Sequence, residues 1–419
     1  MYGPVSVEQF DGSRLPYVDN LIDLVVVSDP GRVPVTEILR VLEPDGKAYF
    51  VANGEVVTKP RPQTIDDWSH FLHDATNNAV ADDQQVGPPR SLQWVAPPLW
   101  LRSHETPSGI QAAVFSGGRT FYFLDEGLIG ITDERLPDRW SLVCRDAFNG
   151  KLLWKRALGN WGWRAWARER WEGKDWTTLR AARTNVPDEA HRRLVAVGDR
   201  VFVTLAFRAP MSILDAATGR TLVTVEETQD AREILVTGGV AVVYVQKGGA
   251  EVAERRGRPS ADQTALIAVD ADTGRVLWKG ECGVIKPLLW AIDSGRIVYV
   301  SGKQLAAIRL KDGQRLWKVS LKRTNVRTLV ATDGVVATQG GRFLAVYDAA
   351  DGRLLWQKSV PPIAGAESFD LFVIRGVLFR GMTSVDDQGR PTRKAPHVLV
   401  VGYDLRTGEE TRRRLVRNL

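Results

Sequence analysis

Short runs rich in β-branched and aromatic residues recur along the chain, and a glycine stands at or near the start of each run. Examples are GDRVFVTL from residue 198, GGVAVVYV from 238, SGRIVYVS from 294 and DGVVATQG from 333. This composition, bounded by turn residues, is typical of β-strands. The pattern therefore predicts many short antiparallel strands rather than helices.

A motif with a glycine at its fifth position follows most of these runs. Its six copies are DAFNGKLLWK at 146, DAATGRTLVT at 215, DADTGRVLWK at 270, RLKDGQRLWK at 309, DAADGRLLWQ at 348 and DLRTGEETRR at 404. An Asp carboxylate can accept backbone N–H groups across a turn, and glycine permits positive φ, so each copy predicts a tight hairpin. The motif residues are Asp146, Gly150, Trp154, Asp215, Gly219, Asp270, Gly274, Trp278, Gly313, Trp317, Asp348, Gly352, Trp356, Asp404 and Gly408.

The spacing of the turn glycines indicates the architecture. Successive glycines lie 69, 55, 39, 39 and 56 residues apart. A minimal unit of 39 residues suits a four-stranded antiparallel blade. We therefore expect a mainly β protein, a β-propeller in which about six blades are visible.

The motif resembles that of the PQQ-binding-like propellers, the quinoprotein alcohol dehydrogenase-like superfamily, in which D-x-x-T-G-x-x-x-W places Trp between adjacent blades. The resemblance covers about residues 64–419, and the segment 66–100 resembles the strap that precedes the first blade. Because such propellers commonly have seven or eight blades, the resemblance implies an incomplete ring. Alternatively, SLQWVA at 91–96 completes the last of six blades.

Residues 1–58 are expected to form a small α/β segment. LPYVDNLIDLVVVSD from 15 and EILRVLEPDGKAYFV from 37 resemble the later half of a class I S-adenosylmethionine-dependent methyltransferase. No glycine-rich loop or acidic ribose ligand precedes them, so we do not expect this chain to bind S-adenosylmethionine. The resemblance implies a chain truncated at both ends, a fragment of a larger protein.

Composition excludes several classes of protein. The net charge is +6, and the lysines and arginines are interspersed with acidic residues over most of the chain. No nucleic-acid-binding motif accompanies the two locally basic runs at 254–258 and 411–417. No segment approaches the roughly 18 apolar residues of a membrane span, and Met1 opens no secretory signal. The two cysteines, Cys144 and Cys282, are too far apart in sequence for a CxxC or vicinal arrangement, which argues against a disulfide framework. The cellular compartment stays open.

The stretch WGWRAWARERWEGKDW, residues 161–176, holds five of the fourteen tryptophans. It lies in the longest interval, and all the insertions are expected on one propeller face, where they would bind a small molecule, a glycan or a protein. Three interpretations are open: a small core that packs over the blade rim, a membrane-edge belt, or a stacking platform for a sugar, quinone or peptide. The platform residues would be Trp161, Trp163, Arg164, Trp166, Arg168 and Trp171.

Catalytic residues cannot be assigned from the sequence. His70 and His73 could ligate a metal, but they also suit a packed strap, and no distant ligand completes a site. The quinone enzymes that the motif resembles use adjacent cysteines, calcium held by Glu and Asn, and an Asp base, and none of these sets can be placed, so binding of PQQ is not supported. We therefore expect a ligand-binding or scaffolding module; the alternatives are a PQQ-dependent oxidoreductase and part of a methyltransferase fusion.

Overall fold

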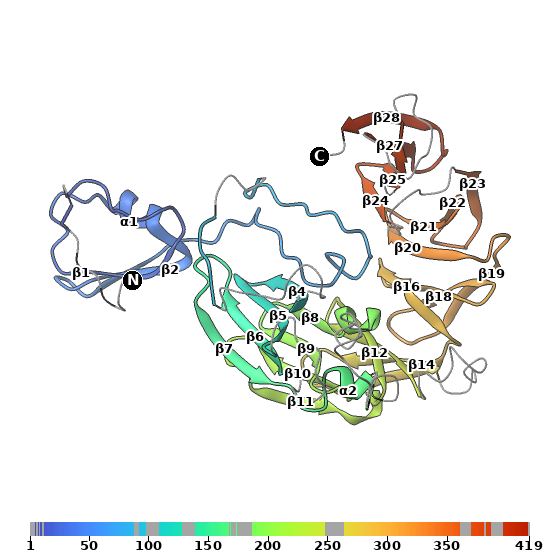
Figure 1. Cartoon of the computed structure of the whole chain (residues 1–419), viewed down its shortest axis with the longest axis horizontal. Helices are drawn as coiled ribbons and strands as arrows, with labels where there is room; N and C mark the ends of the chain where they lie inside the picture. The colour runs from blue at the N-terminus through green and yellow to red at the C-terminus, as the bar shows by residue number, and fades with distance from the viewer. Residues whose placement is uncertain are drawn as a thin grey trace.

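In the part of the chain that the structure describes, six β-sheets follow one another as the blades of a propeller, and a separate three-stranded sheet precedes them (Figure 1). The computed structural model describes residues 5, 7, 9, 10, 12–87, 92–97, 109–127, 139–166, 168, 173, 187–247, 264–360, 370–380, 383–386 and 397–417. Within these ranges, no helix combines the length and the apolar character needed to cross a membrane.

Each blade is antiparallel, and its first strand lies innermost. Blade 1 consists of β4 (Ile110–Ser116), β5 (Arg119–Asp125), β6 (Trp140–Asp146) and β7 (Leu152–Ala157). Blade 2 consists of β8 (Leu194–Val197), β9 (Arg200–Thr204), β10 (Met211–Asp215) and β11 (Thr221–Val225). Blade 3 consists of β12 (Ala231–Thr237), β13 (Val240–Gln246), β14 (Thr264–Asp270) and β15 (Val276–Glu281).

Blades 4 to 6 continue the series. Blade 4 consists of β16 (Ile285–Asp293), β17 (Arg296–Ser301), β18 (Gln304–Arg309) and β19 (Arg315–Ser320). Blade 5 consists of β20 (Val326–Thr332), β21 (Val335–Gly340), β22 (Phe343–Asp348) and β23 (Leu354–Ser359). Blade 6 adds a short strand and consists of β24 (Leu371–Ile374), β25 (Val377–Arg380), β26 (Thr383–Val385), β27 (His397–Asp404) and β28 (Glu410–Arg417). Helix α2 (Trp163–Trp166) and the 3-10 helix η2 (Asp188–Arg192) precede blade 2, and η3 (Glu226–Thr228) precedes blade 3.

The six repeated motifs form the predicted hairpin turns between the third and fourth strands. All six turn glycines have φ between 71° and 76°. In the blade 3 turn, the Asp270 carboxylate accepts hydrogen bonds from the backbone N–H of Thr273 at 2.8 Å and from its hydroxyl at 2.7 Å. The prediction of a carboxylate-braced turn is therefore confirmed.

The motif tryptophans join each blade to the next. Trp317 on β19 donates its indole N–H to the backbone oxygen of Ala349 in blade 5 at 3.0 Å. A Cβ atom added to Gly352 would lie 2.6 Å from the Trp317 ring, so this turn requires glycine for close packing as well as for positive φ. Trp154, Trp278 and Trp356 make the same indole-to-carbonyl bond across their own blade boundaries.

Two boundaries depart from the motif. Blade 2 has Val223 at the tryptophan position, and this side chain covers Gly274 instead. Ahead of blade 1, Trp94 takes the role of a motif tryptophan, because its ring covers Gly150 and its N–H donates to the backbone oxygen of Ala147 at 3.2 Å. The segment 92–96 therefore docks on blade 1 as the outer strand of a preceding blade would.

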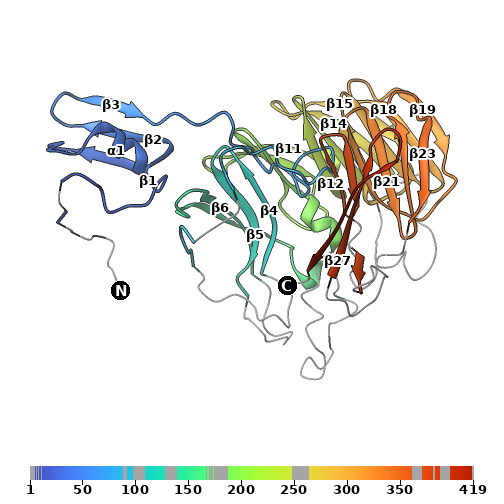
Figure 2. The same cartoon turned by 90° about the horizontal axis from the view of Figure 1, so that it is seen from above.

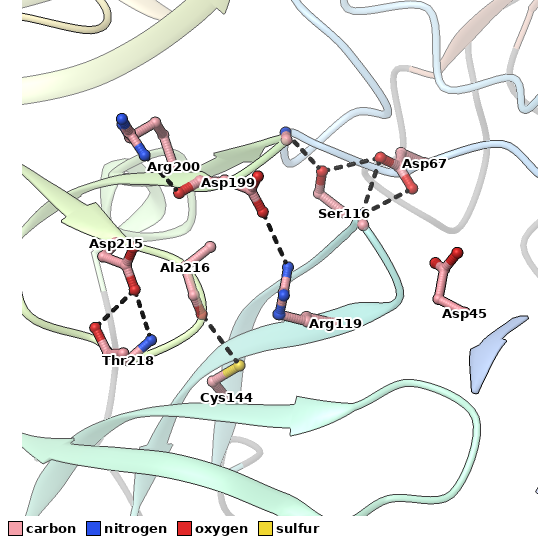
Figure 3. A network of polar contacts seen from close by, with 12 residues as sticks. Asp45, Asp67, Ser116, Arg119, Cys144, Asp199, Arg200, Asp215, Ala216 and Thr218 are labelled. Atoms are coloured by element: carbon pink, nitrogen blue, oxygen red, sulfur yellow. Dashed lines mark hydrogen bonds and ion pairs between the residues drawn. The ribbon is translucent and has the colours of Figure 1, made fainter. Parts of the chain in front are cut away.

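The strap runs along the inner side of the blade array and contacts the blades in chain order (Figure 1). Trp68 pairs with Phe115 of blade 1, the Ala196 N–H of blade 2 donates to the Ser69 oxygen, and the Val236 N–H of blade 3 donates to His70. Figure 3 shows a further link, in which the Asp67 carboxylate accepts from the Ser116 hydroxyl at 2.9 Å, and that hydroxyl accepts from the Gly198 N–H at 3.1 Å.

The second half of the strap reaches blades 4, 5 and 6. The Asn77 amide donates to the backbone oxygens of Trp290 in blade 4 and Leu329 in blade 5. The Asn78 side chain exchanges two hydrogen bonds with the backbone of Val373 in blade 6. The eleven-residue segment 68–78 thus makes at least one hydrogen bond to the innermost strand of each of the six blades.

The N-terminal sheet lies to one side of the propeller (Figure 2). It contains β1 (Ile22–Val27) parallel to β2 (Leu42–Phe50), with α1 (Val35–Val41) between them in sequence, and β3 (Glu55–Thr58) antiparallel to β2. The expected strand–helix–strand order is present.

Candidate central binding site

A cavity of about 740 Å³ lies among the innermost strands. The residues that line it come from the start of β16, β20 and β24 and from η2, and the strap contributes Phe71, Leu72, Asn77 and Ala79. Because blade-to-blade connections lead into the innermost strands, the cavity lies at the end opposite the repeated Asp–Gly turns. A concave site at the centre of a rigid scaffold is a common location for ligand binding.

Basic side chains enter the cavity at irregularities in the innermost strands. In β16 the pairing with β17 skips residues 286–289, and in β20 the pairing with β21 skips Arg327. Lys286 and Arg327 are exposed and line the cavity. A β-bulge redirects a side chain away from the regular pleat, and this is how two cations reach the same cavity from neighbouring blades.

The bulge in β16 carries an unusual backbone conformation. Leu288, which lines the cavity, has φ of 63°, a region that non-glycine residues rarely adopt. Strained residues of this kind gather at binding and catalytic sites, where the surrounding fold holds them in place.

Apolar groups and one carboxylate complete the lining. Phe71, Leu289, Leu371 and Phe372 supply apolar surface, and Asp370 is the carboxylate among the lining residues. Arg192 and His191 of η2 add to Lys286 and Arg327, so basic groups outnumber acidic ones in this cavity.

The two strap histidines are engaged in hydrogen bonds. His70 is buried; its Nε2 accepts from the Val236 N–H at 2.9 Å, and its Nδ1 lies 2.7 Å from the Ser69 hydroxyl. Burial lowers the pKa of His70 to about 4. His73 Nε2 lies 2.8 Å from Asp66 Oδ2, and hydrogen bonding to Asp74 and Asp66 raises the pKa of His73 against the effect of burial. These partners fit the packed-strap interpretation.

The tryptophans of residues 161–166 lie in the core between blades 1 and 2. Trp161, Trp163 and Trp166 are buried, and the Trp166 ring lies 5.9 Å from that of Trp140 in an edge-on arrangement. Arg164 and Arg168 are exposed, and Trp171 lies outside the described residues. The burial favours the packing interpretation for the three described indoles, and the stacking platform stays a prediction.

Three carboxylates meet where the N-terminal sheet contacts blade 1. Oxygens of Asp23, Glu43 and Asp146 lie within 4.8 Å of one another, and the Asn149 amide donates to Asp23 and Glu43. Burial, together with Asp146 and Asp23, raises the pKa of Glu43 to about 8. Because Lys151 also bonds Asp23 at 2.9 Å, we interpret the cluster as a contact between the two units.

Both cysteines are free thiols in different blades. Cys144 lies buried in β6, and Cys282 directly follows β15. Burial raises the pKa of each thiol to about 12, so neither is activated as a nucleophile.

The cavity residues were missed by the sequence interpretation, although the sequence holds a signal for them. The sequences HRRLVAV, AREILVT, IKPLLWA and VRTLVAT lie at the start of the innermost strands of blades 2 to 5, and each has a basic residue before its apolar run; in blade 2 the basic residues directly precede the strand. A repeat search centred on the turn glycines does not single out these positions, because they lie at the opposite end of the blade from the motif and at breaks in the strand register.

Comparisons with known proteins agree with this architecture. A family model described as outer membrane protein assembly factor BamB matches residues 142–328 and 261–414, which together exceed half of the chain. No curated protein matches the sequence.

Solved structures with propeller folds are similar to this one at low identity. A europium-containing methanol dehydrogenase is 12% identical, with 84% of this chain and 78% of that chain covered and a TM-score of 0.50. A quinohemoprotein alcohol dehydrogenase from Comamonas testosteroni is 11% identical, with 84% and 67% covered and a TM-score of 0.46. BamB from Moraxella catarrhalis is 17% identical, with 53% and 74% covered and a TM-score of 0.34. At 12% identity, the similarity to the methanol dehydrogenase shows a shared fold and no shared activity.

Proposed function

Because this chain belongs to the family described as outer membrane protein assembly factor BamB, we propose that it is a binding module whose central cavity takes an anionic ligand with an apolar body. The observation that carries this proposal is the placement of Lys286 and Arg327, at strand bulges, over an apolar lining. The cavity lies on the face where the sequence predicts the binding loops.

Charge and polarity both favour such a ligand. Cations inside a concave site raise the local concentration of anions. Apolar walls nearby lower the effective dielectric constant, which strengthens the attraction between the cations and a bound anion. Phe71, Leu289 and Phe372 offer apolar contact to the remainder of the ligand. A polar anion without an apolar part would leave this surface uncovered.

Reversing the two cavity charges is expected to weaken anion binding. The probe is 1-anilinonaphthalene-8-sulfonate, an aromatic anion that fluoresces when it enters an apolar site. We expect Lys286→Glu with Arg327→Glu to raise its Kd at least tenfold, or about 1.4 kcal/mol. The matched control is Lys311→Glu with Arg275→Glu, two exposed cations on the opposite turn face. No binding by the parent chain, or an equal loss in the control, would contradict the proposal.

The alternative of a PQQ-dependent oxidoreductase is less well supported by the residues present. The enzymes that the motif resembles need adjacent cysteines, whereas Cys144 and Cys282 belong to blades 1 and 3. They also need several oxygen ligands for calcium, whereas Asp370 is the carboxylate of the described lining and the Asn77 amide bonds two strand carbonyls. The cysteines and oxygen ligands of the described residues therefore do not fit PQQ and its calcium ion.

The relation of the N-terminal segment to a methyltransferase stays a proposal. Its fold supplies a strand, a helix and a parallel strand, but the loop between β1 and α1 reads SDPGRVP and contains one glycine. A cofactor cradle of this class uses several glycines so that the backbone can approach the ligand. We expect no binding of S-adenosylmethionine by the purified chain in titration calorimetry, and micromolar binding would overturn this expectation.

A further inference from the structure

Arg192 is a buried cation that lines the central cavity with one donor unused. Its side chain is 5% exposed, and its Nη1 donates to Glu233 Oε1. Both side chains of this ion pair are buried. The Nε–H of Arg192 has no hydrogen-bond partner. Its guanidinium carbon lies 5.5 Å from the centre of the Phe71 ring.

An unpaired buried donor is costly to the fold. Leaving such a group without a partner destabilises the fold, and the penalty is larger when the group is charged. Arg192 lines the cavity, but its Nε atom is buried, so a bound molecule reaches this donor only after a small shift of the side chain. An acceptor on the ligand would then relieve the penalty.

Resting on the function proposed above, we propose that Arg192 binds the carboxylate of a monocarboxylic ligand whose apolar body packs against Phe71, Leu289 and Phe372. Lys286 and Arg327 supply the surrounding positive field rather than this contact.

Charge balance favours a monoanion. Arg192 and Glu233 neutralise each other, so an incoming carboxylate adds one negative charge beside a buried carboxylate. Lys286 and Arg327 offset that charge from the cavity wall. A phosphate dianion would bring twice the repulsion from Glu233, and a neutral amide would offer a weaker acceptor to a cationic donor.

Glu233 acts here as a positioning residue. Its carboxylate accepts from Nη1 and thereby orients the guanidinium. An arginine fork that is fixed in this way binds a planar carboxylate with less loss of side-chain freedom than a flexible lysine would.

The test compares ligands that differ only at the polar end. Naphthalene-2-acetate, naphthalene-2-acetamide and 2-naphthyl phosphate are titrated at pH 8 against the unaltered chain, with displacement of 1-anilinonaphthalene-8-sulfonate as the readout. We expect the carboxylate to bind at least tenfold more tightly than the amide and more tightly than the phosphate. Equal affinity of carboxylate and amide would overturn the proposal without any variant.

A charge-balanced variant then locates the contact. Arg192→Gln with Glu233→Gln removes both charges of the buried pair together, which avoids an isolated buried carboxylate. We expect this variant to lose the preference for carboxylate over amide while its affinity for the amide stays within twofold. A preference that survives in a folded double variant would show that Arg192 is not the contact, whereas the binding function would still stand on the Lys286 and Arg327 result.

Discussion

Replacing Trp317 with alanine is expected to lower the free energy of unfolding by about 3 to 5 kcal/mol. The side chain is 9% exposed, covers Gly352 of the next blade, and donates to the Ala349 oxygen. The substitution opens a cavity between two blades and removes a buried hydrogen bond. Urea unfolding followed by far-ultraviolet circular dichroism measures the change, because this signal does not depend on tryptophan fluorescence.

The neighbouring residue on the same strand provides the control. Leu316 is 37% exposed, so Leu316→Ala removes apolar volume without opening a blade boundary. We expect a loss of at most about 1 kcal/mol for this control. Similar losses for both variants would mean that Trp317 does not join the blades.

The fold was predictable because a local motif carries it. The turn glycines need positive φ, and the Asp carboxylates satisfy the turn backbone, so each repeat specifies a hairpin independently of the remaining chain. The tryptophans then specify the neighbouring blade. The boundary without this residue, at Val223, keeps the same geometry because a smaller apolar side chain covers Gly274.

The central site was not predictable in the same way. Lys286 and Arg327 reach the cavity through bulges, and a bulge breaks the period of two on which strand interpretation depends. The strap depends on pairings far apart in sequence, such as Asn77 with Leu329, which no local pattern encodes. The tryptophans of residues 161–166 attracted a ligand hypothesis because of their density, but density alone does not distinguish a stacking platform from a packed core.

The second large effect that we expect concerns the strap. The protein should lose stability in acid because His70 of the strap becomes protonated. The neutral imidazole accepts from the buried Val236 N–H, and burial lowers the pKa of His70 to about 4 from 6.5. The unfolded chain therefore takes up a proton as pH falls below about 6.5, whereas the native chain does so only near pH 4. Proton uptake favours the unfolded state across this window.

The size of the effect follows from the shift in pKa. One pKa unit corresponds to about 1.4 kcal/mol, so His70 should contribute a loss of about 3 kcal/mol between pH 7 and pH 4. Glu43 acts in the opposite sense, because its raised pKa makes the native chain hold a proton up to about pH 8. A comparison of variants that retain Glu43 cancels its contribution.

The variant His70→Gln isolates the strap contribution to this pH dependence. A glutamine oxygen can accept from the Val236 N–H and does not titrate, so the variant should lose about 3 kcal/mol less than the parent between pH 7 and pH 4, measured by urea unfolding at each pH. His73→Gln is the matched control on the same strap. Because hydrogen bonding raises the pKa of His73, its charged form stabilises the native state at low pH, and its removal should steepen the acid loss. Parallel pH profiles for the parent and His70→Gln would show that protonation of His70 does not limit the acid stability of the strap.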